Sequence, residues 1–151
     1  MSTTFARADR FALPRTALAL LDRLPYALLA IPLRLAVAEV FWASGTTKLA
    51  DWGAAVALFQ DEYKVPVLPP DIAAVMAASI ELSTPILLVL GLFTRGAALV
   101  LLGMTAFIEI FVYPLAWPTH IQWAAMLLVL LARGAGTLSL DAAIRARCLG
   151  A

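Results

Sequence analysis

The stretch IAAVMAASIELSTPILLVLGLF, residues 72–93, decides the fold, because this long apolar run contains a single charged residue, Glu81. A helix that crosses the hydrocarbon core of a bilayer needs about 20 predominantly apolar residues, at a rise of about 1.5 Å each. A membrane-spanning strand would instead show about ten residues of alternating polarity. The run therefore predicts a transmembrane α-helix.

The composition of the whole chain agrees with this prediction. Of its 151 residues 63% are hydrophobic and 14% charged, and the mean hydropathy is +0.92, whereas soluble domains are about 45–50% apolar and about 25% charged. Similar apolar runs cover residues 27–47 and 96–117. A shorter apolar run follows them, and it is long enough to cross a membrane only if its helix extends over residues 120–134. We therefore predict an all-α integral membrane domain, a four-helix bundle over residues 27–134.

Two kinds of segment are expected outside the spans. Residues 1–26 carry four arginines and two prolines and are predicted to be a cytoplasmic, interfacial segment, and residues 135–151 are predicted to be a cytoplasmic tail. Between the first two spans, residues 51–63 place their large apolar side chains near helical spacing, which predicts an amphipathic surface helix. These side chains are Trp52, Val56, Phe59 and Tyr63.

The distribution of basic residues predicts the orientation. The two tails and the connection between the second and third spans hold eight lysines and arginines, whereas the other two connections hold two. Short loops rich in these residues stay in the cytoplasm. Both termini are therefore expected in the cytoplasm, which requires an even number of spans.

Several function classes are excluded by residue counts. The net charge is +1 with no basic run, so nucleic acid is not an expected partner. A single cysteine, Cys148, excludes an intrachain disulfide or a Cys-x-x-Cys pair, and a single histidine, His120, excludes bis-histidine haem ligation. No intrinsic cofactor is expected, and any redox cofactor must be loosely held, borrowed or lipid-soluble.

Four charged residues lie inside the predicted spans: Arg34, Glu39, Glu81 and Glu109. A charge at the centre of a bilayer costs at least about 2.5–3.5 kcal/mol, so these side chains are expected to face the bundle interior or a hydrated cavity. Arg34 and Glu39 are five residues apart and cannot pair on their own helix. Each needs a partner on another helix, and Arg34 is expected to reach Glu81.

A polar layer is expected in the outer half of the bundle. Lys48 and His120 lie at the outer ends of the first and fourth spans, close to the depth of the three carboxylates. Thr105, Glu109 and Tyr113 follow one another at i, i+4 and i+8, which marks one face of the third span as inward. The acids, the lysine and the histidine are therefore predicted to converge.

Three interpretations of this layer are open. The charges can be buried pairs that specify packing, or carboxylates that exchange protons. The acids and His120 could also ligate a divalent cation, but no spacing such as His-Glu-x-x-His supports a metal site. Most of the tryptophans are expected to anchor helices at the membrane interface, and Trp42, close in depth to Glu39, could form the wall of a site for a planar ligand.

The segments FWASGTTKLADW, residues 41–52, and IELSTPILLVLGLFTR, residues 80–95, resemble the DoxX family of small four-helix membrane proteins. Similar members have an arginine in the first helix, Ser-Gly-x-x-Lys-Leu at its end, Glu-Leu in the second helix and Gly-x-x-Thr-Arg before the third. The matching residues here are Arg34, Ser44, Gly45, Lys48, Leu49, Glu81, Leu82, Gly91, Thr94 and Arg95. The resemblance covers roughly residues 31–131.

The resemblance implies a multi-pass protein of the bacterial inner membrane that serves as a subunit of a redox or stress-response system and contacts quinone. It implies no autonomous enzyme, because a protein partner would have to deliver the electrons. In this mechanism the chain's own residues divide into three groups. Proton exchange falls to Glu81, Glu109 and Glu39, charge stabilisation to Arg34, Lys48 and Arg95, and ligand binding to Trp42, Thr105, Tyr113 and His120.

Two other functions fit the same sequence. One is a non-enzymatic assembly or accessory protein for exported metal-binding or redox proteins, with Trp52 and Phe59 of the amphipathic helix as docking residues. The other is a small proton- or cation-linked transporter that uses the carboxylates as its path. The expected partners are membrane lipid and either a different protein or further copies of the chain.

Overall fold

The computed structural model describes residues 18–19 and 21–149, and within them every regular element is a helix. Most of the segment predicted over residues 1–26 therefore lies outside the described residues. The elements are α2 (Tyr26–Ala50), α3 (Trp52–Leu58), η1 (Phe59–Tyr63), α4 (Pro70–Leu90), α5 (Thr94–Phe107), η2 (Ile108–Val112), α6 (Trp117–Arg133) and α7 (Leu140–Leu149). The predicted all-α class is confirmed.

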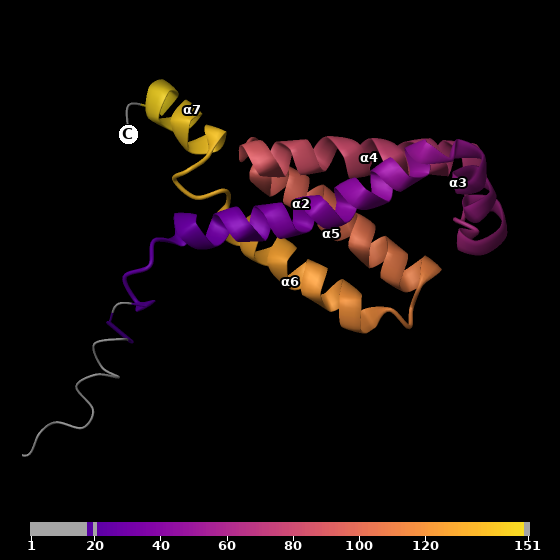
Figure 1. The fold of residues 1–151 in the computed structure, drawn as a ribbon, viewed down its shortest axis with the longest axis horizontal. Coiled ribbons are helices and arrows are strands. Elements are labelled where there is room, and N and C mark those ends of the chain that lie inside the picture. Colours follow the sequence, from indigo (N-terminus) through magenta and orange to yellow (C-terminus); the bar gives the residue numbers. More distant parts are fainter. Residues whose placement is uncertain (1–17, 20, 150–151) are drawn as a thin grey trace, which may run out of the picture.

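The long helices α2, α4, α5 and α6 pack against one another (Figure 1). Helix α2 packs along α4, α4 contacts α5, α5 packs along α6, and α6 contacts α2. Three stretches are long and apolar enough to cross a membrane, namely α2, α4, and α5 together with η2. Helix α6 has 17 residues and is shorter than these three, so a fourth span stays a prediction.

The centre of the bundle is built from small and branched apolar side chains. Alanines and a glycine allow close approach of the helices, as is common where helices pack within a membrane. A Cβ atom added to Gly45 would lie 2.9 Å from the Leu82 side chain, so a larger residue here would force Leu82 or the helices to shift where α2 meets α4. The fully enclosed residues of this core include Val37, Phe41, Leu88, Leu101, Leu127 and Leu130.

The outer faces of the long helices are apolar as well. Leu35, Val75, Ile86, Val89 and Leu99 are each about half exposed. A soluble protein rarely exposes so many large apolar side chains on adjoining helices. Such a surface suits the hydrocarbon of a bilayer, as the composition predicts.

The connections follow from local sequence. Asp51 caps α3 by accepting a hydrogen bond from the Ala54 amide at 2.9 Å. The predicted helix over 51–63 is present as α3 followed by the π-helical turn η1. Helix α6 ends at Gly134, whose φ is +75°, and Ser139 caps α7 through the Ala142 amide at 3.2 Å. Both residues, the glycine that ends α6 and the serine that caps the start of α7, are predicted by the sequence.

The bundle has two different ends. Helices α3 and η1 lie across one of them, called here the α3 end, and α7 lies at the other, called the α7 end (Figure 1). Each end is associated with a cavity. The α3-end cavity is lined by four of the polar residues predicted for a site, Lys48, Glu81, Tyr113 and His120.

Candidate functional site

A cavity of about 430 Å³ lies between α2, α4, α5 and α6 at the α3 end. Its volume is in the range of small-molecule sites, and like them it has mostly apolar walls with a few polar groups. The polar side chains that line it are Ser44, Lys48, Tyr63, Glu81, Tyr113 and His120. The chain thus brings Lys48, Glu81, Tyr113 and His120, all predicted as site residues, to one cavity.

An ion pair joins α2 to α4 in this cavity. The Lys48 ammonium donates to Glu81 Oε1 at 2.9 Å and to Oε2 at 2.8 Å, and to Ser44 Oγ at 2.9 Å. Ser44 in turn donates to Glu81 Oε1 at 3.1 Å. The side chains of Lys48 and Glu81 are 11% and 4% exposed. Because an ammonium has three N–H donors, this cluster uses all of them, and Lys48 acts as a fixed positive charge.

A second polar pair joins α6 to η2. The His120 Nδ1 atom lies 2.6 Å from Glu109 Oε2, a charge-assisted contact that orients the ring. His120 lines the cavity, whereas Glu109 lies behind it. The other ring nitrogen, Nε2, makes no hydrogen bond within the described residues, so it is the atom available to a ligand. Glu109 therefore acts through His120.

Aromatic rings form one wall of the cavity. The Trp123 ring lies 5.6 Å from that of Phe41 in an edge-to-face arrangement and 5.1 Å from that of His120. The sequence analysis expects most tryptophans at the membrane interface and does not predict that Trp123 lines a cavity. The sequence does contain a signal for it. Trp123 is three residues after His120, which is predicted to face inward, and residues three apart on a helix share a face.

Two tyrosines close the cavity toward the α3 end. The rings of Tyr63 and Tyr113 meet edge to face at 5.6 Å, and the Tyr113 hydroxyl donates to Glu62. Burial and then this carboxylate raise the pKa of Tyr113 above its ordinary value, and burial also raises the pKa of Tyr63. Both hydroxyls therefore stay protonated at neutral pH, and the contact ties η1 to the segment after η2.

Two predicted charge-stabilising arginines lie at the opposite end. Arg34 is buried and donates from Nη2 to the Leu138 carbonyl oxygen at 3.1 Å. The expected contact between Arg34 and Glu81 is wrong, because Lys48 already occupies the carboxylate. Arg95 donates to the Ala132 carbonyl oxygen at 3.1 Å and also lies at the α7 end.

Three other predicted site residues do not line the cavity. Glu39 is exposed on the outer face of α2, so the expectation that it faces the interior is wrong. Trp42 is 45% exposed on the same helix. Thr105 is buried and donates to the Leu101 carbonyl oxygen at 2.8 Å, within its own helix. The turn η2 changes the helical register after Thr105, so the predicted stripe does not continue along one face.

The two predicted docking residues differ in exposure. Trp52 is 38% exposed on α3, whereas Phe59 is 5% exposed and lines the cavity. Phe59 packs against Ala73, Ala74 and Ala77 of α4, which holds η1 onto the bundle. It is therefore not accessible to an external protein.

The described residues do not support the metal interpretation. Among them, no three side chains of histidine, cysteine, aspartate or glutamate lie close enough together to hold a metal ion. The two acids in the bundle interior instead pair separately, Glu81 with Lys48 and Glu109 with His120. The polar layer thus consists of the Lys48–Glu81 ion pair and the hydrogen-bonded pair His120–Glu109 on an apolar cavity.

Comparisons with known proteins agree with the fold. A family model described as DoxX matches residues 29–114, which is more than half of the chain. The matched residues include α3, η1, α4 and α5, nearly all of α2 and all of η2. No curated protein and no solved structure matches the chain significantly.

Proposed function

The chain belongs to the DoxX family, and from this premise we propose that it is a membrane subunit of a redox or stress-response system that binds quinone in the α3-end cavity. One observation carries the proposal. A single apolar cavity holds an aromatic wall at Trp123, a buried ion pair at Lys48 and Glu81, and an oriented imidazole at His120. A quinone is a planar apolar ring with two acceptor oxygens, and its chemistry matches this lining.

The proposed roles follow from the donors. His120 Nε2 makes no hydrogen bond within the described residues and can hydrogen-bond a quinone oxygen, while Glu109 orients the imidazole ring through Nδ1. The Lys48 charge, held by Glu81 and Ser44, favours negative charge on a nearby oxygen. The rings of Trp123 and Phe41 would pack against the quinone ring. Tyr113 and Tyr63 separate the cavity from the α3 end.

Protons and electrons take different routes in this proposal. Reduction of a quinone to a quinol needs two electrons and two protons. His120 and Glu81 line the cavity and can hold and transfer protons beside the quinone ring, and Glu109 acts on this transfer through His120 Nδ1. The sequence supplies no cofactor motif, so the electrons come from a partner protein, which makes this chain a subunit and not an autonomous enzyme.

The proposal places the protein in the bacterial inner membrane with four spans. Helix α6 would be the fourth span, since it packs along α5 and carries His120. Its 17 residues can be accommodated by local thinning of the bilayer. Arg95, Arg133 and Arg145 all lie at the α7 end, so the positive-inside rule would put that end in the cytoplasm.

An accessory role has separate support from Glu39. This residue is in the middle of α2 and exposed, and none of the ion pairs found within the described residues includes it. A lone carboxylate facing lipid is costly. A partner helix that carries a donor or a positive charge at the same depth would remove this cost, and Trp42 and Leu35 would then lie in that interface.

Quinone content tests the proposal directly. We expect protein purified in a mild detergent to retain quinone, measured per polypeptide by mass spectrometry. Gly103 lines the cavity, and a Cβ added there meets no atom within 4 Å. Gly103→Leu should therefore block the cavity without removing a contact and lower the quinone content severalfold, whereas Gly103→Ala should have a smaller effect.

Charge variants provide a second test of quinone binding. His120→Gln and Glu81→Gln should lower the quinone content, and Glu39→Gln, an acid-to-amide change outside the cavity, should not. Equal quinone content in Gly103→Leu and the unmodified protein would contradict quinone binding in this cavity. Loss of a co-purifying membrane protein in Glu39→Leu, with quinone retained, would support the accessory role.

A further inference from the structure

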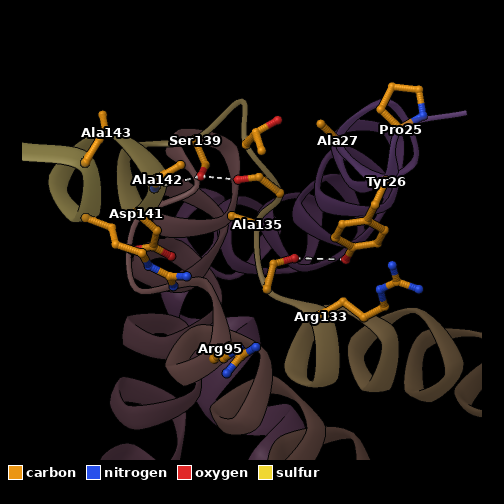
Figure 2. A pocket seen from close by; sticks show the side chains of 15 residues that line it. Pro25, Tyr26, Ala27, Arg95, Arg133, Ala135, Ser139, Asp141, Ala142 and Ala143 are labelled. Atoms are coloured by element: carbon orange, nitrogen blue, oxygen red, sulfur yellow. Dashed lines mark hydrogen bonds between the residues drawn. The ribbon is translucent and has the colours of Figure 1, made fainter. Parts of the chain in front are cut away.

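A second cavity, of about 720 Å³, lies at the α7 end (Figure 2). The start of α2, the start of α5, the end of α6, the segment after it and α7 all contribute to its lining. Arg95 comes from α5, Arg133 from α6 and Arg145 from α7. Three arginines from three helices therefore line one space, which none of the roles proposed above uses.

The positive charge of this cavity is not neutralised by acids. Asp141 is the one carboxylate among the lining residues, and its two oxygens accept from the Phe93 amide at 2.7 Å and the Thr94 amide at 3.0 Å. It caps α5 and forms no ion pair with the arginines within the described residues. The Arg133 guanidinium lies over the Tyr26 ring, 4.6 Å from its centre.

A fourth arginine lies buried at the same end. Arg34 is 5% exposed, and its Nε and Nη1 atoms have no hydrogen-bond partner within the described residues. Its Nη2 atom donates to the carbonyl oxygen of Leu138, which precedes the cavity-lining residue Ser139. A buried guanidinium with unused donors is costly, and a bound anion nearby would offset part of that cost.

We propose that this cavity binds an anionic phosphate group, either the headgroup of an anionic phospholipid or free inorganic phosphate. Guanidinium groups bind phosphate through paired N–H donors, and basic pockets between membrane helices bind lipid headgroups. Leu138, Leu140 and Ile144 are 58%, 43% and 49% exposed on the segments that border the cavity. Such apolar side chains suit acyl chains.

The test uses the full chain in detergent, with dioleoyl phosphatidylglycerol, dioleoyl phosphatidylcholine or sodium phosphate as the added probe and native mass spectrometry as the readout. Arg145→Gln and Arg147→Gln form a matched pair, because both residues are on α7 and only Arg145 lines the cavity. Arg145→Gln should weaken phosphatidylglycerol binding about tenfold, and Arg147→Gln should change it less than twofold. Arg95→Gln with Arg133→Gln should abolish it.

The outcomes separate the two sources of phosphate. Preferential binding of phosphatidylglycerol over phosphatidylcholine, with this variant pattern, identifies the lipid headgroup. Binding of inorganic phosphate with the same pattern identifies a free oxyanion. Equal losses in Arg145→Gln and Arg147→Gln would mean attraction by overall charge and would overturn the proposal, as would absence of binding by every probe. Thermal stability of Arg145→Gln confirms that the variant is folded.

Discussion

Removal of the Lys48 charge by Lys48→Met should destabilise the folded protein by about 3–5 kcal/mol, the usual cost of breaking a buried ion pair. Nζ and Glu81 Oε2 are 2.8 Å apart, and the two side chains are 11% and 4% exposed, so solvent screens them little. At an effective dielectric constant of about 20, charges at this separation attract by about 6 kcal/mol. Methionine keeps the apolar stem, so the loss reports on the charge.

The pair is best measured as a double-mutant cycle. Glu81→Gln alone should lower the unfolding free energy by a similar amount, because it leaves the Lys48 ammonium buried without a counter-charge. The double variant Lys48→Met/Glu81→Gln should lose about 2–3 kcal/mol less unfolding free energy than the sum of the two single-variant losses. Unfolding in mixtures of dodecyl maltoside and dodecyl sulfate, followed by tryptophan fluorescence, gives each free energy.

Lys64→Met is the matched control for this cycle. Lys64 is exposed in the connection before α4, so its loss should change the unfolding free energy by less than about 0.5 kcal/mol. If Lys48→Met were no more destabilising than Lys64→Met, the ion pair would contribute nothing to the fold. Additive single losses would show that Lys48 and Glu81 act independently, which would refute the reasoning from their geometry.

Four further predictions concern stability. Gly136→Ala should cost more than about 1 kcal/mol in the same unfolding assay, because the φ of Gly136 is +78° and the added Cβ would lie 3.0 Å from α2. Gly53→Ala, in the open surface helix α3, should instead stabilise by about 0.5–1 kcal/mol. Asp141→Ala should cost about 1 kcal/mol and expose the start of α5 to hydrogen exchange, since both carboxylate oxygens cap that helix. Burial and Glu62 raise the pKa of Tyr113 above its ordinary value of 10, so its stabilising contribution is complete below about pH 10 and is lost as the pH rises further. Tyr113→Phe should therefore show a smaller loss of thermal stability above pH 10 than the unmodified protein.

The helices were predictable because their signals are local. The apolar run over residues 72–93 and the amphipathic pattern over 51–63 each correspond to helical segments. Helix ends at Gly134 and Ser139 follow from the conformations these residues favour. Whether α6 crosses a membrane depends on lipid and partners, which its 17 residues do not specify.

The facing direction of each charged residue was only partly predictable. Arg34 and Glu39 are about 140° apart around α2, at about 100° per residue. That spacing excludes an ion pair between them and also prevents both from facing one core. Arg34 lies on the buried face together with Val37 and Phe41, so Glu39 points outward. The sequence contained this constraint, but only packing shows which of the two residues is buried.

The pairing of charges required three-dimensional information. The sequence marked Glu81, Lys48 and His120 as polar residues near one depth, and the structure brings them to one cavity. It could not rank Lys48 above Arg34 as the partner of Glu81, because both have long side chains. The deciding fact is that Gly45 lets α2 approach α4 next to Lys48, a contact between helices distant in sequence.

The two cavities differ in charge, and this difference predicts different ligands. At the α3 end, the Lys48 and Glu81 charges that line the cavity pair with each other and so add no net charge to it. An uncharged planar molecule can enter without leaving a net charge in an apolar space. At the α7 end, three lining arginines face one carboxylate that is committed to backbone amides. An anion is stabilised there, and a neutral ring gains nothing from the charge. Variants of the α3-end cavity should therefore leave phosphatidylglycerol binding unchanged, and variants of the α7-end cavity should leave the quinone content unchanged.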